Sequence, residues 1–256
     1  MTTRKTIGYG FLAVILTLTF TALSLTGCSG TGGGKSLNSA TELKEYLDKQ
    51  PGISPDQPIK VAMKVNDMMI EGIVEVIKNA GKYVSLDLSG SPLTEMPRQA
   101  FYECKTLVGI IIPNSVTSIG YEAFQGCTSL ASVTIPSSVT SIGDHAFSSC
   151  RSLTSITIPN GVTSIGTYAF WGCESLISVI IPNSVTEIRQ RAFCYCPSLT
   201  SITIPASVEY VGAYAFDLGP ASQTITIQGK ANRAATIAAG WDEYWDDCDA
   251  QINYGQ

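Results

Sequence analysis

The sequence is poor in charged side chains, and its few cationic residues do not cluster. Only 14% of the 256 residues are charged and the formal net charge is −5 at pH 7. Nucleic-acid binding depends on a basic patch or stripe that neutralises phosphates, and no such stripe is present. We therefore expect no nucleic-acid partner.

Residues typical of catalysis and metal binding are equally scarce. His145 is the single histidine, and its neighbour Asp144 is better explained as a solvated turn residue than as an orienting partner in acid–base catalysis. The eight cysteines do not follow the C-x₂₋₄-C spacing of zinc sites. We expect no catalytic residues, no metal and no cofactor, and a protein that is not an enzyme.

What the sequence does contain is one unit repeated almost five times between Leu107 and Ser201. The unit is L-x-x-[IV]-x-I-P-x-x-V-x-x-[IV]-x-x-x-A-F-x-x-C-x-S, and its 23-residue period is typical of a leucine-rich-repeat solenoid. The predicted fold class is an α/β solenoid whose coils form a parallel β-sheet, with a small α/β N-terminal cap and a helical C-terminal cap. Two columns are expected to fill its core: Phe101, Phe124, Phe147, Phe170, Phe193 and Phe216, and Cys104, Cys127, Cys150, Cys173 and Cys196.

A third column suggests a special backbone conformation. Glycine recurs at Gly120, Gly143, Gly166 and Gly212, which predicts a turn with positive φ. Arg189 occupies the same column in one coil, so the requirement is not absolute.

The cysteine column allows two interpretations. Cysteines stacked at coil spacing are near enough for disulfides, which export would permit, but a small buried apolar group is the favoured role. If Cys28 carries a lipid, seven of the eight cysteines remain and at least one has no partner within the chain. Cys194 and Cys248 lie off the column and are the best disulfide candidates, a pairing that the sequence leaves open.

The N-terminus predicts export. Residues 1–27 combine the basic Arg4 and Lys5 with an apolar run and read as a lipoprotein signal peptide. The tetrad Leu25-Thr26-Gly27-Cys28 resembles the bacterial lipobox, in which the cysteine receives diacylglycerol and becomes the mature N-terminus. The alternative is an uncleaved membrane anchor. Both place the repeats outside the cytoplasm.

Residues 28–36 form a glycine-rich stretch that we interpret as a lipid-anchored flexible tether. Its sequence SGTGGGKS is similar to a nucleotide-binding P-loop, but Ser29 stands where the first glycine is required and no buried strand precedes it.

Residues 37–82 lack the repeat and are predicted to cap the first coil. Ser39 and Glu42 have capping-box spacing at the start of a helix. An alternating strand pattern and a second helix ending near Gly81 follow, built on Ile59, Val61, Met63 and Val65 and on Ile70, Ile73, Val74 and Ile77. Met63, Met68 and Met69 are interpreted as core filling rather than as a ligand groove.

The repeats extend over residues 83–228 and residues 229–256 are expected to cap the last coil. There the spacing i, i+3, i+4, i+7 of Trp241, Tyr244, Trp245 and Cys248 predicts an amphipathic segment that covers this coil, with an aromatic partner-binding patch as the alternative.

The unit IPxSVTSIGxxAFxxCxSLxS resembles the BspA-type leucine-rich repeat of bacterial surface proteins, over residues 83–228. With the lipobox and tether, the chain is similar to lipoprotein members of that family. The resemblance implies an exported, membrane-anchored lipoprotein of the outer membrane or cell surface that adheres to host proteins or other bacteria. It implies no catalytic residues and names no ligand.

Two surfaces of the solenoid are candidates for binding a protein or glycan. The outward strand positions form a hydroxyl-rich sheet face, Ile111, Ser132, Thr134, Ser155, Thr157, Ser178, Ile180, Ser201, Thr203, Thr224 and Thr226. The alternative is an aromatic turn edge, Glu122, His145, Tyr168, Trp171, Arg191, Tyr195 and Tyr214. A structural or self-associating envelope scaffold without a host ligand is the other functional class, and the oligomeric state stays open.

Overall fold

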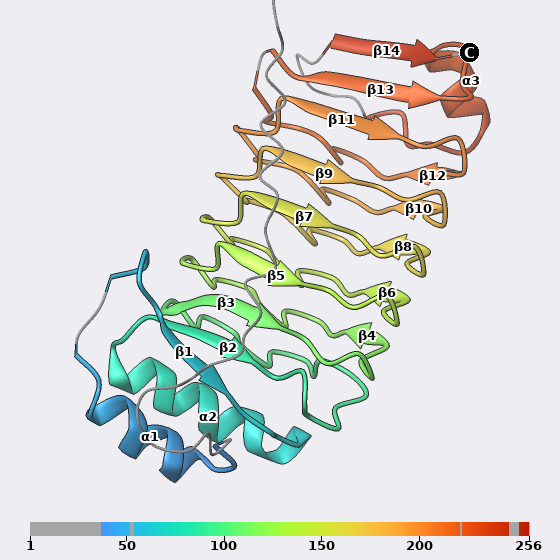
Figure 1. Ribbon diagram of the computed structural model, residues 1–256. Helices are drawn as coiled ribbons and strands as arrows, with labels where there is room; N and C mark the ends of the chain where they lie inside the picture. Colours follow the sequence, from blue (N-terminus) through green and yellow to red (C-terminus); the bar gives the residue numbers. More distant parts are fainter. Residues whose placement is uncertain (1–36, 52–53, 221, 246–250, 256) are drawn as a thin grey trace, which may run out of the picture. The chain divides into compact units, whose positions relative to one another are not determined.

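The computed structural model describes residues 37–51, 54–220, 222–245 and 251–255, all of which belong to one compact unit, Ser36–Gln256. The chain winds as a parallel β-solenoid with one main strand per coil (Figure 1). The predicted leucine-rich-repeat fold class is confirmed. Within the described residues, no helix is both long and apolar enough to cross a membrane.

Two helices and one strand precede the repeats. Helix α1, Ala40–Asp48, begins as the capping-box spacing predicts, because the Ser39 hydroxyl accepts a hydrogen bond from the Glu42 N–H at 3.1 Å. Helix α2, Asp67–Ala80, ends at Gly81, whose φ of 59° is the left-handed conformation that glycine tolerates. Met63 is buried, but Met68 is 89% exposed on α2, so the prediction that Met68 fills the core is wrong.

The main sheet follows the 23-residue step. Strand β1, Ile59–Ala62, pairs with β2, Val84–Asp87, and later strands pair in parallel, as where Ser155 lies opposite Ser178. The pairing is interrupted between β5 and β7 and between β9 and β11, and its register shifts once between β2 and β3. The strands after β2 are β3 Leu107–Ile111, β5 Ser132–Thr134, β7 Ser155–Thr157, β9 Ser178–Ile180, β11 Ser201–Ile204, β13 Thr224–Gln228 and β14 Gln251–Gly255. The repeat pattern does not predict β14, which extends the sheet beyond the last coil.

A second, narrower ladder runs along the other side of each coil. Its two-residue strands pair in parallel with the same step, as where Ile119 lies opposite Ile142. They are β4 Ser118–Ile119, β6 Ser141–Ile142, β8 Ser164–Ile165, β10 Glu187–Ile188 and β12 Tyr210–Val211. The apolar residue of each pair is buried, so both ladders line the same core.

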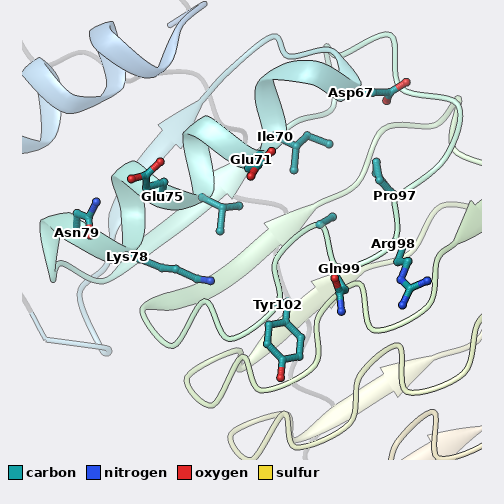
Figure 2. A pocket seen from close by; sticks show the side chains of 12 residues that line it. Asp67, Ile70, Glu71, Glu75, Lys78, Asn79, Pro97, Arg98, Gln99 and Tyr102 are labelled. Atoms are coloured by element: carbon teal, nitrogen blue, oxygen red, sulfur yellow. The ribbon is translucent and has the colours of Figure 1, made fainter.

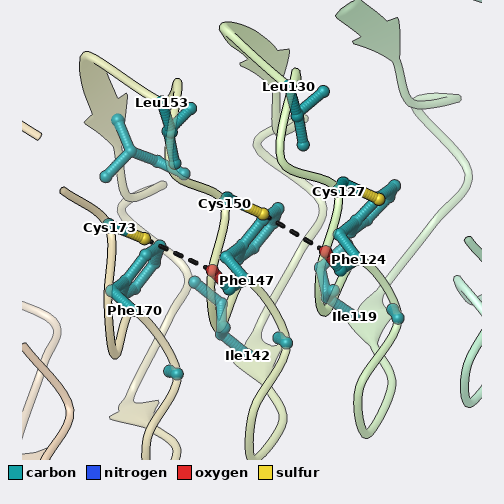
Figure 3. Close-up of a cluster of buried hydrophobic side chains, with 14 of the residues drawn as sticks. Ile119, Phe124, Cys127, Leu130, Ile142, Phe147, Cys150, Leu153, Phe170 and Cys173 are labelled. Atoms are coloured by element: carbon teal, nitrogen blue, oxygen red, sulfur yellow. Dashed lines mark hydrogen bonds between the residues drawn. The ribbon is translucent and has the colours of Figure 1, made fainter. Parts of the chain in front are cut away.

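The core between the ladders is a stack of phenylalanine rings, with cysteines beside it (Figure 3). Neighbouring rings lie 5.2 to 5.7 Å apart and within 6° of parallel. From Cys127 to Cys196, each cysteine of the column donates its S–H to the carbonyl of the phenylalanine in the preceding coil, as Cys127 does to Phe101 at 3.0 Å. The thiol therefore fills a small buried space and also pairs a carbonyl, which alanine could not do.

The turns before each cysteine form a third ladder. Every second N–H donates to a carbonyl of the next coil, as His145 does to Thr167 at 2.9 Å and Phe147 to Ala169 at 2.8 Å. The residues two before each phenylalanine have left-handed backbones with φ between 52° and 58°: Gln99, Glu122, His145, Tyr168, Arg191 and Tyr214. Positive φ is unfavourable for residues with a side chain, and the hydrogen bonds between coils offset that cost.

The prediction of positive φ in the glycine column is wrong. Gly120, Gly143, Gly166 and Gly212 do not have positive φ, and glycine is favoured there because the coils approach closely. A Cβ on Gly166 would lie 2.5 Å from the carbonyl carbon of Gly143. Nothing in the structure explains how Arg189 is accommodated in this column.

The C-terminal residues close the core, although not as the sequence predicts. Helix α3, Arg233–Ala238, lies before the aromatic cluster, and residues 243–245 run in turns. Trp241 and Trp245 are buried in edge-to-face contact at 4.9 Å, and the Tyr244 carbonyl accepts the N–H of Tyr214 at 2.8 Å. Cys248 lies outside the described residues.

We predict that Gly166→Ala destabilises the chain while Gly72→Ala stabilises it. The first Cβ would overlap the Gly143 backbone, which we expect to cost about 1 to 3 kcal/mol. The second lies inside α2, where a Cβ would approach only Ala40 at 3.7 Å, and the helix gains about 0.5 to 1 kcal/mol. Urea unfolding of both variants measures the difference, and equal midpoints would contradict the close-approach explanation.

Candidate functional site

The sheet face is exposed, and its outward strand positions from β3 to β14 carry no charged side chain. Its most exposed large side chains are Ile180, 65% exposed, and Ile177, 56% exposed. Gly109 is buried between hydroxyls, since a Cβ there would lie 3.0 Å from the Oγ atoms of both Ser85 and Ser132. The predicted face residues are exposed at Ser132, Thr134, Ser155, Thr157, Ser178, Ile180, Ser201 and Thr203, and half-buried at Ile111, Thr224 and Thr226.

The turn edge is a continuous column of stacked side chains, because its residues share one left-handed turn position. The His145 ring stacks on Tyr168 at 4.8 Å and 11°, and meets Tyr121 edge-on at 5.8 Å. Further along, Tyr214 stacks on Tyr244 at 6.0 Å. Each ring in the column is thus supported by a neighbour one coil away, and the side chains are half-buried.

Arg191 sits between two rings of this column. Its guanidinium carbon lies 5.6 Å from the Tyr168 ring centroid and 4.9 Å from that of Tyr214, both within cation–π range. Its Nη1 also donates to the Tyr168 hydroxyl at 2.6 Å, which raises the pKa of Arg191 above its ordinary value. Arg191 is therefore held in place before any ligand arrives.

Glu122 supplies a negative charge at the other end of the column. Partial burial raises the pKa of Glu122, but hydrogen bonds from Gln99 and Tyr121 and the charge of His145 outweigh burial and leave this pKa below its ordinary value. The Gln99 amide donates to its carboxylate at 2.6 Å. Arg98 lies at the same end, with its guanidinium carbon 4.7 Å from the Tyr121 ring centroid, so this end of the edge carries charges of both signs.

Trp171 and Tyr195 lie in two adjacent columns of the same edge, since they are 24 residues apart, and both are exposed, as are Tyr121 and Tyr244. Their rings are 6.2 Å apart, with 36% and 44% exposure. Leu218 follows Tyr195 one coil later and is 59% exposed. Sequence patterns missed Leu218 and Gln99, although a 23-residue step from Glu122 would have found Gln99, which extends the stacked column. Tyr244 also extends this column, whereas the sequence analysis placed it only in the C-terminal amphipathic segment.

A groove of about 610 Å³ adjoins the start of this edge, between α2 and the first coil. In Figure 2, Glu71, Glu75 and Lys78 of α2 face Gln99 and Tyr102 across it. Charges of both signs line this groove, so it favours no ligand class by charge.

The described cysteines are free thiols with no reactive environment. Burial raises the pKa of Cys104 and Cys194 to about 11 and that of Cys196 to about 12. Burial also raises the pKa of Cys127, Cys150 and Cys173 well above the ordinary value. Cys194 is unpaired, while Cys28 and Cys248 lie outside the described residues. In the described ranges, no three histidine, cysteine or acidic side chains come together as a metal site.

Coils of 23 residues, a parallel strand in each and a core of stacked phenylalanines define a leucine-rich-repeat protein. Residues 94–220 match the family described as BspA type Leucine rich repeat region in six copies. The repeats of this chain belong to that family.

Solved structures agree with this assignment. A leucine rich cell surface protein from Faecalibacterium prausnitzii A2-165 is 34% identical with a TM-score of 0.53, over 66% of this chain and 42% of its own. The T. pallidum Leucine Rich Repeat protein is 28% identical with a TM-score of 0.54, over 80% of this chain and 82% of its own. This chain therefore spans less than half of the first protein and most of the second. A comparison with curated proteins finds no match.

We predict that the folded chain loses stability as the pH rises above about 9. Burial keeps the thiols of Cys104 and Cys194 protonated up to a pKa of about 11, from 9.0, whereas in the unfolded chain they ionise near 9. The unfolded state therefore releases protons first, and stability present below pH 9 declines between 9 and 11.

Urea unfolding between pH 7 and 10.5 measures this loss. A Cys127→Ala/Cys150→Ala variant, which lacks two titrating thiols, should be less stable at pH 7 but show a shallower decline. Parallel curves for the two proteins would rule out the thiols as the cause.

Proposed function

We propose that this chain is a lipid-anchored cell-surface protein, an adhesin or surface antigen, that binds a protein partner through the turn edge of its repeats. The repeat family and its likeness to a bacterial cell surface protein support a place at the surface. We choose the turn edge because Trp171 and Tyr195 are exposed there and because the guanidinium of Arg191, on the same edge, is fixed by its contacts with neighbouring rings.

Residue chemistry favours the turn edge over the sheet face for a foreign partner. Binding hot spots are enriched in tryptophan, tyrosine and arginine, whereas serine and threonine are under-represented in them. At this edge the side chains are already stacked and hydrogen-bonded, so binding orders few of them and loses little entropy. Leucine-rich repeats typically serve as binding scaffolds, which supports a non-enzymatic role.

We predict that Cys28→Ala prevents lipid attachment. The lipobox tetrad places the acceptor thiol at Cys28, so wild-type chain should incorporate radiolabelled palmitate and partition with membranes, while the variant should do neither. Cys194→Ala is the matched control and should label normally. Labelling of the Cys28→Ala chain would contradict the anchor.

Surface display has its own test on intact cells. Protease should cleave the repeats while a periplasmic protein, the leakage control, survives. Protection of the repeats until the envelope is opened would remove the adhesin proposal.

We predict that a Trp171→Ala/Tyr195→Ala chain displayed on cells binds its partner at least tenfold more weakly than wild type, since truncating hot-spot aromatics commonly costs about 2 kcal/mol or more. The probe is a panel of purified extracellular-matrix proteins, each tested with and without enzymatic deglycosylation. Thr134→Ala/Thr157→Ala on the sheet face is the matched control and should bind like wild type.

Three outcomes would overturn this proposal. Loss of binding only in the sheet-face control would move recognition to that face, and loss on deglycosylation would make the ligand a glycan. Absence of saturable binding to any probe would remove the adhesin function.

A further inference from the structure

Five coils turn sharply after the main strand, and one of these turns differs from the others. Each turn spans four residues, begins with proline, and is closed by a hydrogen bond from a valine N–H to the proline carbonyl at 3.0 to 3.1 Å. We call them the proline turns, and they are residues 113–116, 136–139, 159–162, 182–185 and 205–208. The third residue is serine in four of them and Gly161 in the remaining one, where Asn160 precedes it.

The serines of the proline turns tie each coil to the one before it. Their hydroxyls donate to a backbone carbonyl of the preceding coil at 2.5 to 2.9 Å: Ser115 to Leu93, Ser138 to Val116, Ser184 to Val162 and Ser207 to Val185. Gly161 has no hydroxyl for the equivalent carbonyl of Val139, although a Cβ at Gly161 would lie only 3.0 Å from that oxygen. The proline turn that contains Asn160 is therefore held to the preceding coil by one hydrogen bond fewer.

Other contacts of the same coil are also weaker. The N–H of Thr163 donates to the Thr140 carbonyl at 3.3 Å, whereas the equivalent bonds of the other coils measure 2.8 to 2.9 Å. The Thr163 hydroxyl also lacks the bond to the preceding coil that, among the described residues, three other threonines make: Thr117, Thr140 and Thr186. The main sheet is interrupted at the same boundary, between β5 and β7 (Figure 1). The proline turn 159–162 is therefore the one most able to open locally.

Asparagine followed by glycine is prone to react with its own backbone, and asparagine is among the thermolabile residues. The Asn160 side chain is exposed to water, and within the described residues the Gly161 N–H donates to no group. Glycine also presents no side chain that would shield its nitrogen from Cγ of the asparagine. The nitrogen and the amide that it can attack thus lie next to each other in a turn that water reaches.

We propose that Asn160 is a site of spontaneous deamidation and reacts faster than the other asparagines of the proline turns. When the turn opens, the Gly161 nitrogen loses its proton to water and forms a bond to Cγ of Asn160. The bond from Cγ to Nδ2 then breaks, and ammonia leaves with a proton taken from water. Water adds to one of the two carbonyl carbons of the resulting cyclic imide, which gives aspartate or isoaspartate. The sequence of steps involves no oxidation or reduction.

The modification changes both the charge and the backbone of this coil. Either product adds one negative charge to the turn, and isoaspartate also moves the side-chain CH₂ of residue 160 into the main chain. The bonds that this turn makes with the preceding coil are already few, so little opposes the change. Older copies of the protein therefore differ from new ones at one defined turn.

The test is peptide mapping by mass spectrometry of the folded full chain during incubation at pH 8 and 37 °C. Asn114 and Asn183 occupy the same place in two other proline turns but precede serine, so they are internal controls. We expect Asn160 to deamidate about tenfold faster than either, because serine hinders the attack and its hydroxyl anchors the turn. An isoaspartate-specific methyltransferase should label the peptide that contains residue 160, and Gly161→Ser should abolish this label.

Ser184→Gly separates the effect of the turn from that of the dipeptide. This variant holds Asn-Gly at two equivalent positions, and the second lies where β7 and β9 are paired and Thr186 keeps both of its bonds to Thr163. In the folded variant, Asn160 should deamidate about threefold faster than Asn183, because its turn opens more often. In urea the two should react at equal rates, and thermal unfolding checks that the variant is folded.

The proposal is overturned if Asn160 of the wild-type chain reacts no faster than Asn114 and Asn183. Equal rates at the two Asn-Gly pairs of folded Ser184→Gly would overturn the role of the loosely held turn. Neither measurement involves Trp171 or Tyr195, so both outcomes are independent of ligand binding at the turn edge.

Discussion

The whole solenoid depends on one backbone constraint: the polar groups of each coil are paired by the coils beside it. The sheet, the narrow second ladder and the turn ladder all bond across the same 23-residue step. A change of one residue in a coil shifts the register, as between β2 and β3, where the step changes from Val84–Leu107 to Ser85–Gly109. Where no such bulge absorbs the change, buried N–H and C=O groups would be left unpaired, at a cost of about 1 to 3 kcal/mol each. The repeat length is thus set by hydrogen bonding, and the apolar columns follow it.

The fold could be predicted because the same residue pattern recurs in every coil. The phenylalanine and cysteine columns, which include Phe147 and Cys150, can be recognised from sequence spacing alone. Features outside the period were less accessible. Positive φ occurs at His145 and not at the glycines of the repeat. Glycine is favoured both where φ is positive and where two backbones approach closely, and the sequence alone does not show which of these two reasons applies. Strand β14 and the Trp241–Trp245 turns depend on contacts with the last coil that no repeat encodes.

Both candidate binding surfaces could be recognised in the sequence as columns of residues, but the sequence did not show how exposed the side chains of each surface are. Trp171 and Tyr195 are exposed, whereas His145, Tyr168 and Arg191 of the ring column are half-buried and contact one another. One period therefore yields two chemically different surfaces on a common core, aromatic on the turn edge and hydroxyl-rich on the sheet, and each can change without altering the other.

The turn ladder also gives the solenoid a direction. Its bonds run one way, from the N–H of each coil to the carbonyl of the next, so their dipoles add along the stack as they do in a helix. The last coil presents donors and needs a carbonyl, which Tyr244 supplies, while the first coil presents the carbonyls of the same positions. The two ends are therefore not interchangeable: whole coils can be inserted or removed between them, but a cap built for one end has the wrong hydrogen-bonding groups for the other.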